Sequence, residues 1–193
     1  LHYEQLDSHL LHIYLLVAPD LVGVPSFVPL IKSNPDVVKR ALRMKRLCNE
    51  LCDILVGRHV HPISAVVGGF TKLPSVNDLE EMHKKLLDLR QDMEATVELF
   101  SNLTFPEFER DTEYVGLVND EDEYPFLYGD IGSTDGFRVS KYEYKNVTNE
   151  FIVPYATAKR TKWHRESYAV GALARFNLNH EKLHPKAKEA AAV

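Results

Sequence analysis

The segment GRHVHPISAVVGGF, residues 57–70, constrains the fold of this 193-residue chain more than any other stretch. Gly57 follows a stretch with helical apolar periodicity, and glycine at such a position predicts the end of a helix. Pro62 restricts the residue before it, so His61 is expected in an extended conformation. The chain path directly after the helix is therefore expected to be fixed.

Two glycines and two further polar residues complete this segment. Gly68 and Gly69 allow backbone angles or close approaches that a side chain would block. Arg58 and His59 are held on the same loop, and an extended backbone would point His59 away from the second histidine of the HVHP run. The segment therefore predicts a stiff loop that presents polar side chains and ends in a glycine turn.

Apolar residues recur at intervals of three and four in three parts of the chain, which predicts three amphipathic helices. The first helix carries the apolar residues Leu6, Leu10, Ile13, Tyr14 and Val17 and is expected to end at Pro19-Asp20, and a loop follows over residues 23–35. The second is expected over residues 35–56, with Asn34 as its cap and Val38, Leu42, Leu47, Leu51 and Leu55 along one side. The third starts at a capping box of Ser75 and Asp78 and runs for about 25 residues as one helix across the core, with Leu86, Leu89 and Met93 buried.

Cys48 and Cys52 are the two cysteines of the chain, four residues apart on the second expected helix. This spacing places both thiols on one face, which supplies two of the four ligands that a structural metal site uses. Both thiols coincide with the apolar stripe of the helix, and a buried free cysteine packs as a small apolar side chain. We therefore interpret them as core residues and expect no metal ligand in this chain.

After residue 106 the composition changes from Leu, Lys and Glu to Tyr, Val, Gly and Asp. The short runs YVGLV, FLY, GFRVS and YEY predict a small antiparallel sheet over residues 112–153, with NDEDEYP and GDIGSTDG as turns. The fold class is thus α+β: a mainly α-helical bundle with a small antiparallel β lobe. We expect a bundle over residues 1–104, the lobe over residues 105–154, and a return segment over residues 155–193 whose C-terminal helix packs on the bundle.

The charge and hydropathy patterns exclude two classes of protein. The net charge is −5, and no face rich in Lys and Arg stands out, which argues against binding to nucleic acid. The longest apolar region, near the N-terminus, is interrupted by three prolines and an aspartate, so no membrane span is expected. With 45% hydrophobic residues the chain can bury a substantial core.

Three stretches, in order along the chain, resemble the large (alpha) subunit of nickel-iron hydrogenases, and most closely the soluble, cofactor-reducing type. They are SHLLHIYLLVAPDLVG at residues 8–23, the loop at residues 57–70, and YATAKRTKWHRESYAVGALARFNLN at residues 155–179. Ala172 stands where the family pattern has proline. The resemblance spans nearly the whole chain, but both Cys-x-x-Cys pairs that hold the metals in this family are missing, so we interpret the chain as an internal fragment.

The resemblance implies a function for the complete subunit. It implies oxidation of H2 or reduction of protons at a nickel-iron centre, with no activity expected from this chain alone. It also implies a partner, the iron-sulfur small subunit, with iron-sulfur clusters in that partner. Further electron-transfer subunits for a soluble nicotinamide or deazaflavin carrier are implied as well, together with a cytoplasmic location.

The same resemblance assigns two groups of residues. Ser8, His9 and His12 match the helix that passes close to the bimetallic centre and forms part of its surround. Serine cannot carry the charge of the aspartate found in other members, so any electrostatic role would pass to Asp7 or disappear. The second group matches a loop that, in the family, faces the small subunit and its nearest iron-sulfur cluster. It consists of Arg58, His61, Pro62, Gly68 and Gly69. Judged from the residues alone, a core or interface role for the first group and a purely structural loop for the second stay open. His164 and the remaining histidines are interpreted as local or solvent-facing.

Two alternative functions stay open at this point. The quinone-site subunit of respiratory complex I shares the ancestry of the hydrogenase large subunit; it keeps similar His-Pro and Gly-Gly runs without the metal cysteines. A helical interaction module without an active site is the other alternative. The Ser-His-x-x-His and ALARFN runs favour the hydrogenase interpretation.

Overall fold

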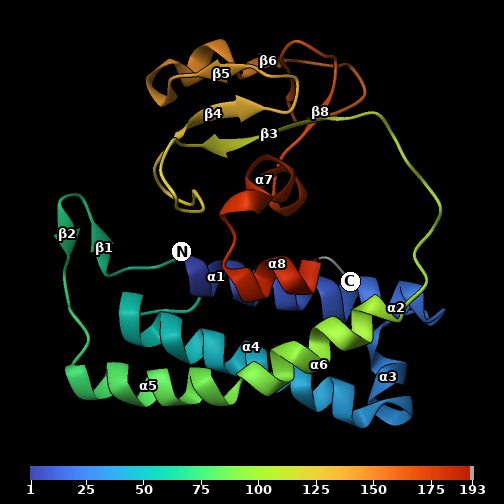
Figure 1. Ribbon diagram of the computed structural model, residues 1–193, viewed down its shortest axis with the longest axis vertical. Coiled ribbons are helices and arrows are strands. Elements are labelled where there is room, and N and C mark those ends of the chain that lie inside the picture. The colour runs from blue at the N-terminus through green and yellow to red at the C-terminus, as the bar shows by residue number, and fades with distance from the viewer. Residues whose placement is uncertain (192–193) are drawn as a thin grey trace. The chain divides into compact units, whose positions relative to one another are not determined.

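The computed structural model describes residues 1–191 and divides the chain into two compact units, Leu1–Pro106 and Glu107–Val193 (Figure 1). The first unit is helical and the second combines strands with short helices, which confirms the α+β class. The boundary lies close to the composition change that the sequence shows after residue 106. Among the described residues, no helix is long and apolar enough to cross a membrane.

The first unit contains two short strands among its helices. In chain order its elements are α1 (His2–Leu11), the π-helix η1 (His12–Val17), α2 (Ala18–Leu21), α3 (Phe27–Ser33), α4 (Pro35–Val56), β1 (Ala65–Val66), β2 (Gly69–Phe70), α5 (Val76–Asp88) and α6 (Arg90–Ser101).

Prolines in this unit are tolerated inside helical segments where the sequence predicted an end or a loop. The first helical segment runs without a break through Pro19 and ends at Leu21, one residue beyond the predicted end. Pro29 lies in the first turn of α3, whose cap, Ser26, accepts a hydrogen bond from the amide of Val28. The expected end at Pro19-Asp20 is correct to within one residue. The expected uninterrupted loop over residues 23–35 is wrong, because α3 lies within it.

The predicted second helix is confirmed as α4 (Pro35–Val56). Gly57 ends it in the left-handed conformation, with φ of 78°, as the sequence predicted. Asn34 precedes the first turn, but its side chain forms no capping hydrogen bond.

The predicted third helix is two helices. The capping box is confirmed, because the Ser75 hydroxyl accepts from the Asp78 amide and the Asp78 carboxylate accepts from the Ser75 amide. The expectation of one helix of about 25 residues is wrong, because Leu89 is a turn residue between α5 and α6. Leu89 is buried, Leu86 is partly buried, and Met93 is exposed.

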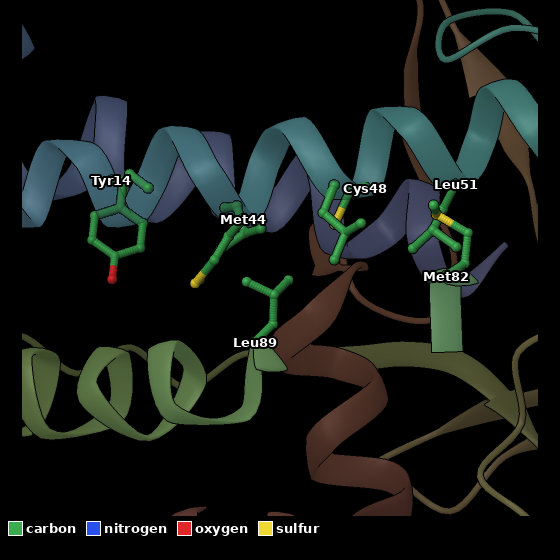
Figure 2. Close-up of a cluster of buried hydrophobic side chains, with 9 residues drawn as sticks. Tyr14, Met44, Cys48, Leu51, Met82 and Leu89 are labelled. Atoms are coloured by element: carbon green, nitrogen blue, oxygen red, sulfur yellow. The ribbon is translucent and has the colours of Figure 1, made fainter. Parts of the chain in front are cut away.

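The core of the first unit lies between the first helical segment, α4, and the α5–α6 pair (Figure 2). Burial of apolar side chains away from water supplies most of the stabilisation of such a bundle. Cys48 and Cys52 are both buried, which confirms their predicted packing role. The buried cluster consists of Leu10, Tyr14, Ala41, Met44, Leu47, Cys48, Leu51, Met82 and Leu89.

The second unit is built around a four-stranded sheet of order β5-β4-β3-β8. Its elements are β3 (Glu113–Val118), β4 (Asp130–Ser133), β5 (Arg138–Val139), the 3-10 helix η2 (Lys141–Asn146), β6 (Asn149–Phe151), β7 (Arg160–Lys162), β8 (Tyr168–Ala169), α7 (Ala172–Asn179), η3 (His180–Lys182) and α8 (Pro185–Ala191). The β3–β4 and β4–β5 pairs are antiparallel, as predicted, and β8 joins β3 in parallel from outside the predicted range.

The sequence placed some of these strands wrongly. The run GDIGSTDG, predicted as a turn, contains β4, while Phe126–Tyr128 forms no strand and the YEY run lies in η2. Helix α7 packs on β3, and Gly116 permits the close approach, because a Cβ atom there would lie 3.3 Å from Leu178 Cδ1. The expectation that the C-terminal helix packs on the helical bundle stays a prediction.

Candidate functional site

The first group of candidate residues lies on the first helical segment. Ser8 and His12 are exposed, four residues apart, and therefore share one face. His9 is partly buried beside them. The opposite face carries Leu10 and Tyr14 into the core, so the orientation of this segment is fixed by packing.

An ion pair that the sequence did not predict anchors the same segment to α4. Both carboxylate oxygens of Asp7 lie 2.8 Å from Nζ of Lys45, and the Asp7 side chain is 16% exposed. Lys45 therefore balances the charge of this carboxylate. The residues are 38 positions apart, so no local spacing rule reveals the pair.

A π-helical turn starts at His12, the last residue of this group. π-helical turns within α-helices are rare and occur frequently at functional sites. The buried Tyr14 hydroxyl lies 2.7 Å from Thr96 Oγ1, and Thr96 donates to the carbonyl of Asp92 at 2.6 Å. The bond between Tyr14 and Thr96 ties the π-helical turn to α6.

The second group of candidate residues lies on the loop after α4. The loop closes on itself, because the amides of Ile63 and Ser64 both donate to the carbonyl of Val56 at 3.1 Å. Arg58, His61 and Pro62 lie between these anchor points and are all exposed. The predicted presentation of polar side chains on this loop is confirmed, while its stiffness stays a prediction.

Two histidines on this loop have distinct environments. His59 Nδ1 lies 2.9 Å from the Asp53 carboxylate, a contact open to solvent on both sides. His61 has φ of 57°, so its expected extended conformation is wrong. Histidine enters the left-handed region more readily than most residues, and the chain must reverse here to return to Val56.

Gly68 and Gly69 belong to a small hairpin. Ala65 pairs with Phe70 and Val66 with Gly69, so Val67 and Gly68 form the turn. Gly68 has φ of 88° and Gly69 has φ of 156°, conformations that favour glycine. The hairpin is held to the loop by the Thr71 amide, which donates to the Ser64 carbonyl at 2.8 Å. The structure thus places the two candidate groups on different elements of the first unit.

The close packing inside this loop yields a stability prediction. We expect Gly57→Ala to destabilise the first unit by about 2 kcal/mol, because φ is positive and the new Cβ would lie 2.7 Å from Ser64 Oγ. Gly23→Ala is the matched control, since Gly23 has φ of 71° and no atom within 4 Å of a Cβ. Urea unfolding of both variants measures the difference, and equal losses would contradict close loop packing.

The residues of this chain do not fit a metal centre. Among the described residues, no group of three or more His, Cys, Asp or Glu side chains could hold a metal ion. Burial, with the nearby Asp7 charge, raises the pKa of the Cys48 thiol to about 12, and burial also raises the pKa of Cys52. A metal would have to displace a proton from a thiol in the packed core.

A buried polar network in the second unit was missed by sequence reasoning. Glu113 is fully buried, and its Oε1 accepts from Ser133 Oγ at 2.5 Å and from His164 Nδ1 at 2.8 Å. An ionised Glu113 only accepts, and in that state Nδ1 of His164 is the donor. The imidazole also stacks on Phe137, with ring centroids 3.5 Å apart. The interpretation of His164 as local is wrong, since its partner lies 51 residues away, while the residue is exposed, as also predicted.

The known proteins found to be similar to this chain are hydrogenase subunits. The alpha subunit of sulfhydrogenase 1 from Pyrococcus furiosus is 35% identical over 96% of this chain. The chain is homologous to part of the hydrogenase alpha subunit. A vhu subunit of the F420-non-reducing hydrogenase from Methanocaldococcus jannaschii is 29% identical, also over 96% of the chain.

The homology covers less than half of the Pyrococcus protein. This chain spans 44% of the length of that protein and 50% of the length of the Methanocaldococcus protein. An NAD⁺-reducing NiFe-hydrogenase solved in its H2-reduced state has the same fold, with a TM-score of 0.81 and 23% identity, and the match covers 91% of this chain and 45% of the solved chain. No protein-family model matches the sequence.

Proposed function

We propose that this chain forms the internal part of the large subunit of a nickel-dependent hydrogenase, which oxidises H2 or reduces protons in the complete enzyme. The observation that carries this proposal is the homology to hydrogenase subunits along 96% of the chain. The relatives found are hydrogenase subunits, and no contact in the structure favours the quinone-site or interaction-module alternatives.

The proposal assigns the chain a framework role. A nickel-iron centre would be held by residues outside this chain, because the thiols present lie in the core. Ser8, His9 and His12 would border that centre from the rigid first helical segment. Asp7, Lys45, Tyr14 and Thr96 fix the orientation of this segment, so that the exposed side chains keep their positions.

The partner assignment follows from the loop after α4. We place the iron-sulfur small subunit, with its clusters, against Arg58, His61 and Pro62, since these side chains are exposed on a loop that is closed by two hydrogen bonds. The hairpin with Gly68 and Gly69 extends this face, with Val67 and Phe70 exposed beside them. Further electron-transfer subunits would use a soluble nicotinamide or deazaflavin carrier.

Nickel content tests the proposed function. A complete subunit, made by placing this chain between the flanking regions of the Pyrococcus relative and matured with its partners, is expected to hold nickel stoichiometrically and to reduce a dye with H2. The chain alone is expected to retain no nickel after washing with chelator, because its thiols are buried and protonated. Stoichiometric nickel in the chain alone, or a folded complete subunit without nickel, would contradict the proposal.

Mutations in the loop test the partner assignment. In the complete enzyme, His61→Ala is expected to leave nickel content unchanged and to slow electron transfer or shift the potential of the nearest cluster, because one donor near that cluster is lost. Arg58→Ala is expected to weaken association of the subunits more strongly, by about tenfold, because arginine contributes several donors and a planar packing surface. His59→Ala, in the same loop, is the control. Unchanged potential, activity and association for both variants would show that the loop is only structural.

A further inference from the structure

The β6–β7 hairpin of the second unit is an exposed arm. Every residue of both strands is exposed, and among the described strands β6 and β7 pair only with each other. Ile152 and Tyr155, in the connection between them, are 80% and 78% exposed. A two-stranded ribbon is marginally stable in water, and its outer edges leave backbone groups unpaired. The arm therefore has the features of an element that gains stability from a partner.

The base of the arm is firmly attached to the sheet. Directly after β7, the His164 imidazole bonds to the buried Glu113, stacks on Phe137 and contacts the tilted ring of Trp163. Arg165 then pairs with Asp135 at 2.8 Å. A further bond, from Tyr168 to Thr161 at 3.1 Å, joins the arm to β8. A rigid base with an exposed, apolar end suits docking, because less conformational freedom is lost on binding.

The charges on the arm indicate the chemistry of its partner. Glu150 and Lys159 pair with each other across the strands at 2.7 Å. Arg160 lies over the Tyr155 ring and Lys162 over the Phe151 ring, and neither cation has a carboxylate partner among the described residues. The arm thus offers apolar and aromatic surface bordered by two cations. It fits an apolar polypeptide surface that carries carboxylates.

We propose that the arm, residues 149–162, docks onto the part of the large subunit that lies outside this chain. This inference rests on the proposed function. The related Pyrococcus protein has more than half of its length outside the matched region, so a large polypeptide surface is available within the same subunit. A second copy of this chain fits poorly, because two identical arms would bring Arg160 and Lys162 of each copy together.

Hydrogen exchange tests the docking. In this chain alone, the backbone amides of the arm are expected to exchange quickly. In the complete subunit made with the Pyrococcus flanking regions, their exchange is expected to be slower by at least about tenfold. Slow exchange in the chain alone, or a chain that self-associates through the arm in sedimentation, would overturn the inference. Fast exchange in a folded, nickel-loaded complete subunit would overturn it as well, while leaving the proposed function intact. Slowed exchange in a subunit without nickel would support the docking and contradict the function.

Paired variants separate docking from general folding. Ile152→Asp and Tyr155→Asp are expected to abolish the slowed exchange of the arm in the complete subunit, because each places a charge in the apolar contact. Leu127→Asp is the matched control, since Leu127 is also a largely exposed apolar residue of the second unit but lies outside the arm. All three chains alone should unfold at similar urea concentrations. Equal exchange in all three complete subunits would overturn the inference.

Discussion

Replacing Leu51 with alanine is expected to lower the free energy of unfolding of the first unit by about 2–5 kcal/mol, the range observed for leucine in packed cores. Leu51 is 2% exposed and lies in the cluster with Cys48 and Met82 (Figure 2). Truncation removes apolar contacts and leaves a cavity that the flanking helices only partly close. Urea unfolding followed by circular dichroism of the helices measures the loss.

Leu42 on the same helix provides the control. The sequence places Leu42 and Leu51 on one stripe, but Leu42 is 51% exposed in the structure. Leu42→Ala is therefore expected to change the free energy of unfolding by less than about 0.5 kcal/mol, as is usual for surface positions. A large loss for Leu42→Ala in the chain alone would contradict the helix orientation described above.

Replacing His164 with alanine is expected to destabilise the second unit by about 3 kcal/mol, because it leaves the carboxylate of Glu113 buried without its ring partner. Glu113 is fully buried, and its Oε2 has no hydrogen-bond partner among the described residues. Loss of the Nδ1 donor would leave Ser133 as the side chain that still bonds to this carboxylate. Urea unfolding followed by fluorescence of Trp163, the one tryptophan of the chain, measures the second unit.

The exposed pair of His59 and Asp53 is the control for the buried pair of His164 and Glu113, because the histidine-to-carboxylate distances are nearly equal. His59 Nδ1 lies 2.9 Å from Asp53, but both side chains are about half exposed. His59→Ala is expected to cost less than about 1 kcal/mol, because solvent screens the contact. Equal losses for His59→Ala and His164→Ala would show that burial of Glu113 does not matter.

Features that depend on a few neighbouring residues were predictable. The glycine end of α4 and the capping box of α5 are fixed by hydrogen bonds within one helical turn, so Gly57, Ser75 and Asp78 reveal them in the sequence. The closure of the following loop was not predicted, because it depends on the left-handed conformation of His61 and on bonds back to Val56. Pro29 misled the prediction of a loop, because proline is compatible with the first turn of a helix.

The sequence by itself determined the α+β class, the extent of α4, the core role of Cys48 and Cys52, and the resemblance that the homologous subunits support. Only the tertiary structure decided the break at Leu89, the exposure of Leu42, and the partners of Asp7 and Glu113. The reason is physical. Caps and helical periods arise from bonds between near neighbours, whereas burial and ion pairing depend on which distant segments the folded chain brings into contact.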